Sequence, residues 1–257
     1  WTINNGKLYF NTKLYTGNGG TNAITGVGFQ PDWTWIKGRS VAYSNTVFDV
    51  IRGATKRIET NTSGAESTLS TGLTTWGTDG FTLGSSAAVN ENSATFASWN
   101  WKAGTSFTND ASGTGIGTID STGSFNNTAG FSIVSYTGTG SAGTIKHGLN
   151  SVPKMIIIKA RSAVKDWTVY HNSISAENYL ELNQTIASTD SASTFNDTVP
   201  TSSVFSVGTN GQTNGSSTTY IAYCFAEKQG YSKFSSYTGN GNADGTFIYT
   251  GFSPAFV

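Results

Sequence analysis

Charge, cysteine and long apolar runs are all scarce in this sequence. Charged residues make up 12% of the 257 residues, and 15 basic and 15 acidic side chains cancel to a formal net charge of zero. Because Lys and Arg clusters neutralise phosphates and bind anionic membranes, the sequence argues against a nucleic-acid partner and against adhesion to a membrane surface. No apolar run approaches the roughly 18 residues of a spanning helix, so membrane insertion is not expected. A single cysteine, Cys224, excludes an internal disulfide and a multi-thiolate metal site.

Glycine, serine, threonine and asparagine take the place of the missing charges, yet the chain does not have the composition of a disordered one. Disordered segments are poor in aromatic residues, whereas 7 Trp, 11 Tyr and 15 Phe are spread through this sequence. A folded protein is therefore expected. The sequence opens at Trp1 without a signal-like segment and closes at Val257 in residues typical of the middle of a strand, so we expect a piece of a longer protein.

One unit of about a hundred residues occurs twice and begins a third time. A Tyr-Thr-Gly motif, followed by Asn or Thr and another Gly, marks each copy at residues 15–19, 136–140 and 237–241. From Pro31 and Pro153 the first two copies align without a gap for about thirty residues, so that Phe48 falls on Tyr170. The third copy stops soon after Pro254. We divide the chain into a first repeat (1–104), a linker with the second repeat (105–230) and the beginning of a third (231–257).

Short aromatic and β-branched runs separated by Gly, Asn, Ser and Thr turns predict an all-β protein of tandem jelly-roll-like β-sandwich domains. Residues 155–158 are apolar throughout, which indicates a strand covered on both faces. The β-branched content of residues 163–175 argues against a helix there. Residues 104–130 have the composition of an interdomain connection, with one strand expected around 117–125. The runs that we expect to form strands in the first repeat are residues 7–12, 33–37, 46–50, 81–83 and 96–101.

Pairs of aromatic residues two positions apart raise the question of a sugar-binding platform. Trp33 and Trp35 share one face of a strand, as do Trp99 and Trp101. The second copy has apolar residues at the first pair (155 and 157) and aromatic ones at the second (223 and 225). Core packing therefore explains both pairs better than sugar stacking, which stays as the alternative.

Four other residues are the better candidates for ligand contact. Trp76 lies in a loop-like stretch and has no aromatic counterpart in the second copy, and we group it with Trp167, Tyr170 and His171. Binding residues gather on loops that a rigid scaffold holds in place. The alternative is that these side chains fold over the edge of the core.

No motif supports catalysis, a metal or a cofactor. His147 and His171 lack zincin spacing, no G-x-S-x-G elbow occurs, and no pair of carboxylates stands out as a glycosidase site. The glycine-rich residues 138–143 precede a strand, so they form a hairpin turn and not a dinucleotide site. Residues 240–251 begin like a calcium loop but lack its closing acid. Lys37 and Arg39, repeated as residues 159 and 161, are interpreted as solvated charges that blunt a strand end.

The repeat resembles a jelly-roll-like (lectin/glucanase-type) domain that recurs in tail-fibre-like and other structural proteins of marine tailed phages, including cyanophages. The resemblance covers nearly the whole chain. The residues that carry it include the Tyr-Thr-Gly-Asn-Gly motif at 15–19, the Gly-Phe-Gln-Pro-Asp motif at 28–32, and residues 36–39, 52–56, 79–84, 101–104, 147–149, 220–228 and 230–252.

This resemblance implies a non-enzymatic module of a virion fibre, located at the virion surface outside the cell. A homo-oligomer that contacts other virion proteins and a host cell-surface glycan is expected, since repeated weak sites gain from avidity. Three alternatives stay open. They are a purely architectural capsid decoration or shaft, a bacterial adhesin or filament subunit, and a polysaccharide depolymerase.

Overall fold

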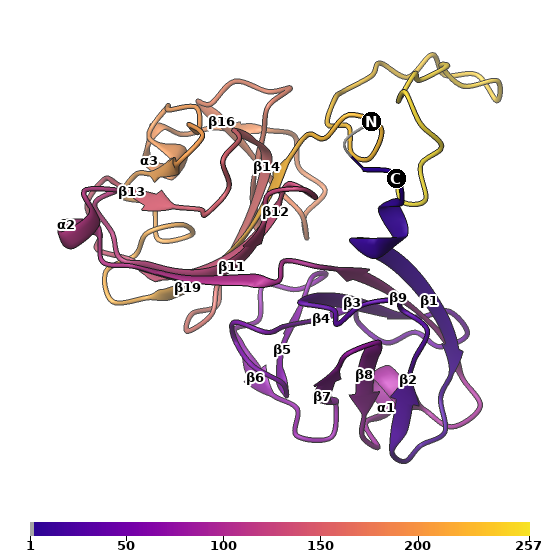
Figure 1. Ribbon diagram of the computed structural model, residues 1–257. Helices are drawn as coiled ribbons and strands as arrows, with labels where there is room; N and C mark the ends of the chain where they lie inside the picture. The colour runs from indigo at the N-terminus through magenta and orange to yellow at the C-terminus, as the bar shows by residue number, and fades with distance from the viewer. Residues whose placement is uncertain (1–2) are drawn as a thin grey trace.

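The computed structural model describes residues 3–257, and its regular structure is almost entirely antiparallel β-sheet, as the sequence predicted. Each repeat consists of one large sheet with a smaller sheet packed on its outer face (Figure 1). This is the predicted β-sandwich class. No helix among the described residues is long and apolar enough to cross a membrane.

The first repeat has a six-stranded sheet in the order β1-β9-β3-β4-β5-β6 and a three-stranded sheet in the order β2-β8-β7. A 3-10 turn, η1 (Gly6–Leu8), precedes the first strand, and a one-turn helix, α1 (Ala87–Asn90), precedes the last. The strands are β1 (Phe10–Thr16), β2 (Asn22–Ile24), β3 (Trp33–Gly38), β4 (Thr46–Asp49), β5 (Lys56–Glu59), β6 (Ser67–Thr68), β7 (Leu73–Gly77), β8 (Gly80–Leu83) and β9 (Thr95–Trp101).

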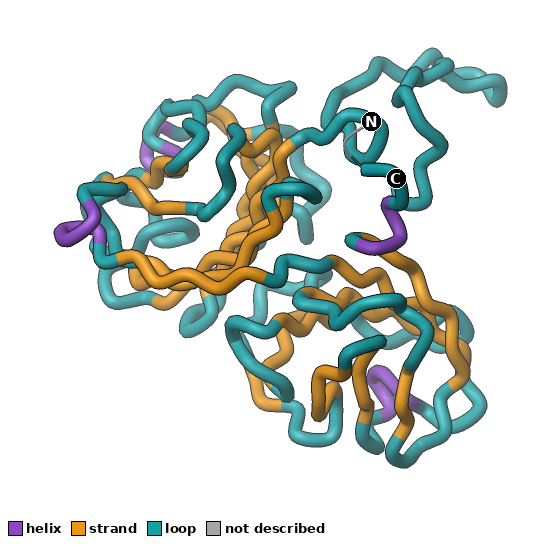
Figure 2. Tube along the Cα trace, in the orientation of Figure 1, coloured by secondary structure: helices purple, strands orange, loops and turns teal. Residues whose placement is uncertain are grey.

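The second repeat has an eight-stranded sheet in the order β10-β11-β12-β19-β14-β15-β16-β17 and a two-stranded sheet of β13 and β18. Two short helices, α2 (Ala111–Thr114) and α3 (Ala192–Phe195), lie in its loops (Figure 2). The strands are β10 (Thr105–Asn109), β11 (Ser121–Asn126), β12 (Phe131–Thr137), β13 (Gly143–Lys146), β14 (Pro153–Ala160), β15 (Thr168–His171), β16 (Asn178–Glu181), β17 (Thr189–Asp190), β18 (Val204–Val207) and β19 (Thr219–Ala226).

The two large sheets share one strand order, which confirms the repeat. The order β12-β19-β14-β15-β16-β17 repeats β1-β9-β3-β4-β5-β6 strand for strand. The hairpin of β10 and β11 is extra, and it extends the second sheet beyond β12. The segment interpreted as a connection thus contributes two strands, one more than predicted, and both belong to the second sheet.

Three apolar clusters fill the spaces between the sheets. One lies inside each sandwich, around Phe48 and Phe96 in the first repeat and around Tyr136 and Ile158 in the second. The third lies between the two large sheets and joins the repeats. Strand β14 has side chains in both the second and the third cluster, so it is covered on both faces as predicted.

The repeated Tyr-Thr-Gly motif is structural. The Tyr15 hydroxyl donates to the carbonyl of Val89 at 2.7 Å, and Tyr136 donates to that of Thr213 at 2.6 Å. A Cβ added to Gly17 would stand 2.1 Å from a backbone oxygen, so the glycine permits a close chain contact.

Two buried asparagines, for which the sequence analysis gave no expectation, complete the same turn in each repeat. Asn90 donates to the carbonyls of Gly20 and Gly84 at 2.7 and 2.8 Å, and its Oδ1 accepts the backbone N–H of residue 18. Asn214 makes the matching bonds to Ser141, Gly208 and the N–H of residue 139. The motif and its asparagine therefore tie β1 to the turn before β9 in the first repeat. In the second repeat they tie β12 to the turn before β19.

Candidate functional site

Stacked aromatic rings at the junction of the two large sheets form the most distinctive feature of the molecule. Trp33 lies with its ring centroid 4.4 Å from that of Trp101 and 4.5 Å from that of Tyr223 in the second repeat. Phe131 and Phe225 pack around the same rings. Because Trp33 is 2% exposed and Trp101 8% exposed, core packing is confirmed for these two residues.

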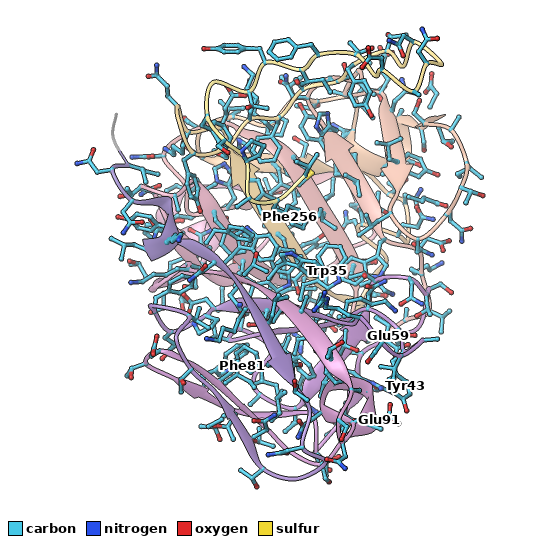
Figure 3. All side chains as sticks on the ribbon, turned by 90° about the vertical axis from the view of Figure 1, so that its right-hand side faces the viewer. Trp35, Tyr43, Glu59, Phe81, Glu91 and Phe256 are labelled. Carbon is cyan, nitrogen blue, oxygen red and sulfur yellow. The ribbon has the colours of Figure 1, made fainter. Side chains whose placement is uncertain are left out.

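Trp35 and Trp99 extend this face to a partly exposed margin. Their rings meet edge to face, with centroids 6.3 Å apart, so they do not form the flat strip that a sugar ring stacks on. Phe256 lies against Trp99 and Trp101 at 5.9 and 5.6 Å. Figure 3 shows Phe256 and Trp35 in the middle of the molecule, where the repeats meet.

The predicted ligand contact does not assemble, and two of its four residues were assigned wrongly. Trp167 is fully buried between the repeats and donates its Nε1–H to the carbonyl of Glu59 at 2.9 Å. Tyr170 is 2% exposed and packs in the second repeat against Phe195. Neither side chain can contact a ligand on the surface.

The other two predicted residues lie in different sheets. Trp76 is in strand β7, not in a loop, where it pairs with Phe81 and packs partly buried against the core of the first repeat. His171, at the end of β15 in the second repeat, is partly exposed, and its Nδ1 accepts the N–H of Ser173. A contact of either residue with a ligand stays a prediction.

A buried ionic cluster crosses the junction between the repeats. The Asp49 carboxylate accepts hydrogen bonds from Arg52 Nε at 2.5 Å and from the hydroxyl of Tyr223 at 2.7 Å, and all three side chains are buried. Burial opposes the charge on Arg52, but Asp49 and its other neighbours raise the pKa of the guanidinium. Burial also raises the pKa of Tyr223, so its hydroxyl stays a hydrogen donor to the carboxylate.

The loop at residues 60–67 of the first repeat holds two basic side chains of the second. Arg161 forms a two-pronged pair with Glu66 at 2.9 and 3.1 Å. The Lys159 ammonium donates to the carbonyls of Ser63 and Lys165, and its burial lowers the pKa to about 8. The interpretation of these residues as solvated charges is therefore wrong for the second repeat, because the loop covers them.

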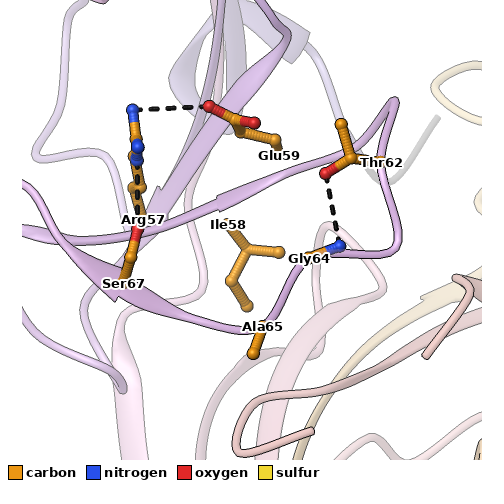
Figure 4. Close-up of a pocket in the computed structure, with 7 residues that line it drawn as sticks. All are labelled: Arg57, Ile58, Glu59, Thr62, Gly64, Ala65 and Ser67. Atoms are coloured by element: carbon orange, nitrogen blue, oxygen red, sulfur yellow. Dashed lines mark hydrogen bonds and ion pairs between the residues drawn. The ribbon is translucent and has the colours of Figure 1, made fainter. Parts of the chain in front are cut away.

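Two hollows in the surface are small and are lined mainly by residues that carry polar groups. One of about 140 Å³ lies beside the same loop (Figure 4), lined by residues 57–59, 62, 64, 65 and 67. Its polar groups satisfy one another, as in the pair of Arg57 with Glu59 at 3.3 Å. Another of about 270 Å³ lies where β10, β11 and β12 meet. Both are below the roughly 300 Å³ of the smallest usual ligand pockets. The part of the chain from residue 3 onward holds no cluster of three side chains suited to a metal ion.

A comparison with protein families places the chain. The sequence model of a domain of unknown function, DUF7483, matches residues 5–257. The chain belongs to the DUF7483 family. No curated protein and no solved structure matches it. The DUF7483 match spans both repeats and the start of the third.

The last 27 residues of this DUF7483 chain, 231–257, form an irregular segment that we call the C-terminal arm. Phe234 and Phe256 anchor it to aromatic rings of the second and the first repeat, respectively. Between these anchors it presents Tyr237, Phe247 and Tyr249 to solvent, the last two 87% and 79% exposed. The repeat pattern alone did not indicate that these apolar side chains would be exposed.

Proposed function

We propose that this chain is a non-enzymatic structural module of a bacteriophage virion fibre, exposed at the virion surface and in contact with copies of itself and with other virion proteins. The single observation that carries the structural role is the junction between the repeats. Stacked aromatic rings and a buried ionic cluster join the two sandwiches into one body, the construction expected of a stiff spacer. The virion location rests on the resemblance of the repeat to domains of phage fibre proteins.

Among the alternatives, the arrangement favours the purely architectural role over adhesion to a host glycan. Two of the four predicted contact residues, Trp167 and Tyr170, are buried within the body. Trp35 and Trp99 meet edge to face, and Phe256 lies against Trp99. A glycan site on this chain would need an open row of aromatic rings, since sugar rings stack on exposed aromatic faces.

The test combines location with binding. Antibodies raised against the chain should label fibres on phage particles in immunogold electron microscopy, and the purified chain should bind no glycan on an array. Labelling of bacterial surface filaments in cultures free of phage would overturn the virion assignment. Glycan binding that Trp35→Ala weakens, and that the matched variant Val164→Ala at an exposed loop position does not weaken, would replace the architectural role with adhesion. Release of reducing ends from a polysaccharide would indicate a depolymerase.

A further inference from the structure

Strand β1 is a long, open sheet edge. It is the terminal strand of the six-stranded sheet, where only β9 pairs with it. The opposite edges of the two large sheets are β6 and β17, which have two residues each, whereas β1 has seven. Natural proteins protect edges by shortening them or by placing proline and charge there. Along β1 there is no proline, and Lys13 is the one charged residue.

The backbone of β1 presents free hydrogen-bonding groups on that edge. At its two ends, the carbonyl of Tyr9 accepts the N–H of Lys102, and the N–H of Gly17 donates to the carbonyl of Ala94. In an antiparallel pair such bonds fall on alternate residues, so the odd-numbered residues of β1 bond to β9. The N–H and C=O groups of the even-numbered residues therefore point away from β9, and among them the Thr16 carbonyl accepts a hydrogen bond from Asn22 Nδ2 at 3.2 Å.

The second repeat shows that this edge of the fold accepts another strand. Its β12 is the counterpart of β1, and β11 pairs with it along the full register from Ser121 opposite Tyr136 to Asn126 opposite Phe131. Strand β10 then pairs with β11. The first repeat has no such hairpin beside β1 among the described residues.

The C-terminal arm contains a segment suited to pairing with the β1 edge. Residues 246–250 read Thr-Phe-Ile-Tyr-Thr, which are all residues enriched in strands, yet no strand includes them. By the repeat they correspond to β2 and β13. In a strand Phe247 and Tyr249 would lie on one face. On the receiving edge, Leu14 is 57% exposed and offers them an apolar neighbour.

The arm of the same chain does not pair with that edge. Figure 1 shows the arm looping away above η1, with only its last residues returning to the top of β1. Phe256 holds that end against Phe10 and Trp101. Residues 246–250 are left exposed on the far part of the loop, where they can reach a neighbouring molecule.

We propose that the β1 edge binds residues 246–250 of a second copy of this chain as an added strand. Donor and acceptor are different surfaces, so the contact runs head to tail. This contact rests on the proposed structural role and identifies a second copy of the chain as the partner. It does not depend on a virion location. Immunogold labelling tests the virion location, and the molar mass in solution tests the contact between copies. Either proposal can therefore fail while the other holds.

The experiment measures the molar mass of the full chain by light scattering across a concentration series. The wild type should exceed the 27.1 kDa of one chain as the concentration rises. Leu14→Pro removes an outward N–H of the edge without touching a bond to β9, and it should abolish association. The arm variant Phe247→Asp with Tyr249→Asp should do the same. Val164→Asp, at a loop position of the second repeat that is 68% exposed, is the matched control and should associate like the wild type.

Mixing the two defective variants gives the sharpest test. The Leu14→Pro chain keeps its arm and the arm variant keeps its edge, so one intact contact forms between them. The mixture should therefore reach about twice the mass of either variant alone and grow no further. A wild type that is monomeric at every concentration, or a mixture that stays monomeric while both variants show native circular dichroism, overturns the proposal. If Leu14→Pro unfolds the chain, Leu14→Lys serves as the edge variant.

Discussion

Removing a tyrosine hydroxyl at the junction of the repeats should lower the free energy of unfolding more than removing a tyrosine hydroxyl inside one repeat. Tyr223→Phe deletes the hydroxyl that donates to the buried Asp49 carboxylate at 2.7 Å. Hydrogen bonds to charged groups contribute about 1.5 to 3 kcal/mol. Asp49 keeps its bonds from Arg52 Nε and from two backbone N–H groups, so it is not left unpaired. We therefore expect a loss of about 2 kcal/mol in the free energy of unfolding.

The matched control is Tyr15→Phe, which deletes a hydroxyl that donates at the same 2.7 Å to the neutral carbonyl of Val89. A neutral bond of this kind contributes about 1 kcal/mol. Urea unfolding at neutral pH, followed by fluorescence and circular dichroism, gives both values from midpoints at unchanged slope. Because the repeats share a core, one transition is expected in both variants. A smaller loss for Tyr223→Phe than for Tyr15→Phe, or separate transitions for the two repeats in the wild type, would refute the reasoning.

Three further results are expected. Burial lowers the pKa of His147 from 6.5 to about 4, so between these pH values the unfolded chain binds a proton that the folded chain does not. The free energy of unfolding should therefore be at its full value above about pH 6.5 and fall by roughly 3 kcal/mol toward pH 4. In His147→Gln, the midpoint of urea unfolding should lose this dependence on pH. Asn90→Ala and Asn214→Ala should each cost about 3 kcal/mol or more in thermal or urea unfolding, because each leaves several buried backbone groups without a partner; a loss under about 1 kcal/mol would contradict their role. Burial raises the pKa of the Cys224 thiol to about 12, so Ellman's reagent should react with it only after the chain unfolds.

The sequence predicted those parts of the fold that each repeat carries within itself. Strand runs, turn residues and the core position of Trp33 follow from alternation and from the alignment of the two copies. The same alignment could have corrected one error, since Tyr170 falls on Phe48 and both are buried in equivalent positions. The hairpin of β10 and β11 was predicted only in part, because its Gly, Ser and Thr content is also that of a connection. Its strands are recognised by their pairing with β12.

What the sequence could not predict is the contact between the repeats. Trp167 stacks on Tyr223 of its own repeat, but part of its burial comes from the other repeat. The first repeat also binds it through the carbonyl of Glu59. Burial of this kind depends on how two folded units pack, and no periodicity in either unit encodes it. For the same reason the exposed margin at Trp35 could not be told apart from the buried Trp33 two residues earlier.

The junction is also unequal, and this bears on how copies can be added. Lys37 and Lys159 occupy the same position in the two repeats, but Lys37 donates to Tyr43 in its own repeat, whereas Lys159 is held by a loop of the other. Arg39 is exposed while its counterpart Arg161 is paired with Glu66. In this part of the junction the first repeat supplies a loop, whereas the aromatic part joins equivalent sheet faces, because β3 and β9 correspond to β14 and β19. The loop contact is therefore heterologous, whereas the aromatic contact joins like faces. The proposed contact at the β1 edge is heterologous as well, so its expected products are rings or open filaments of this chain.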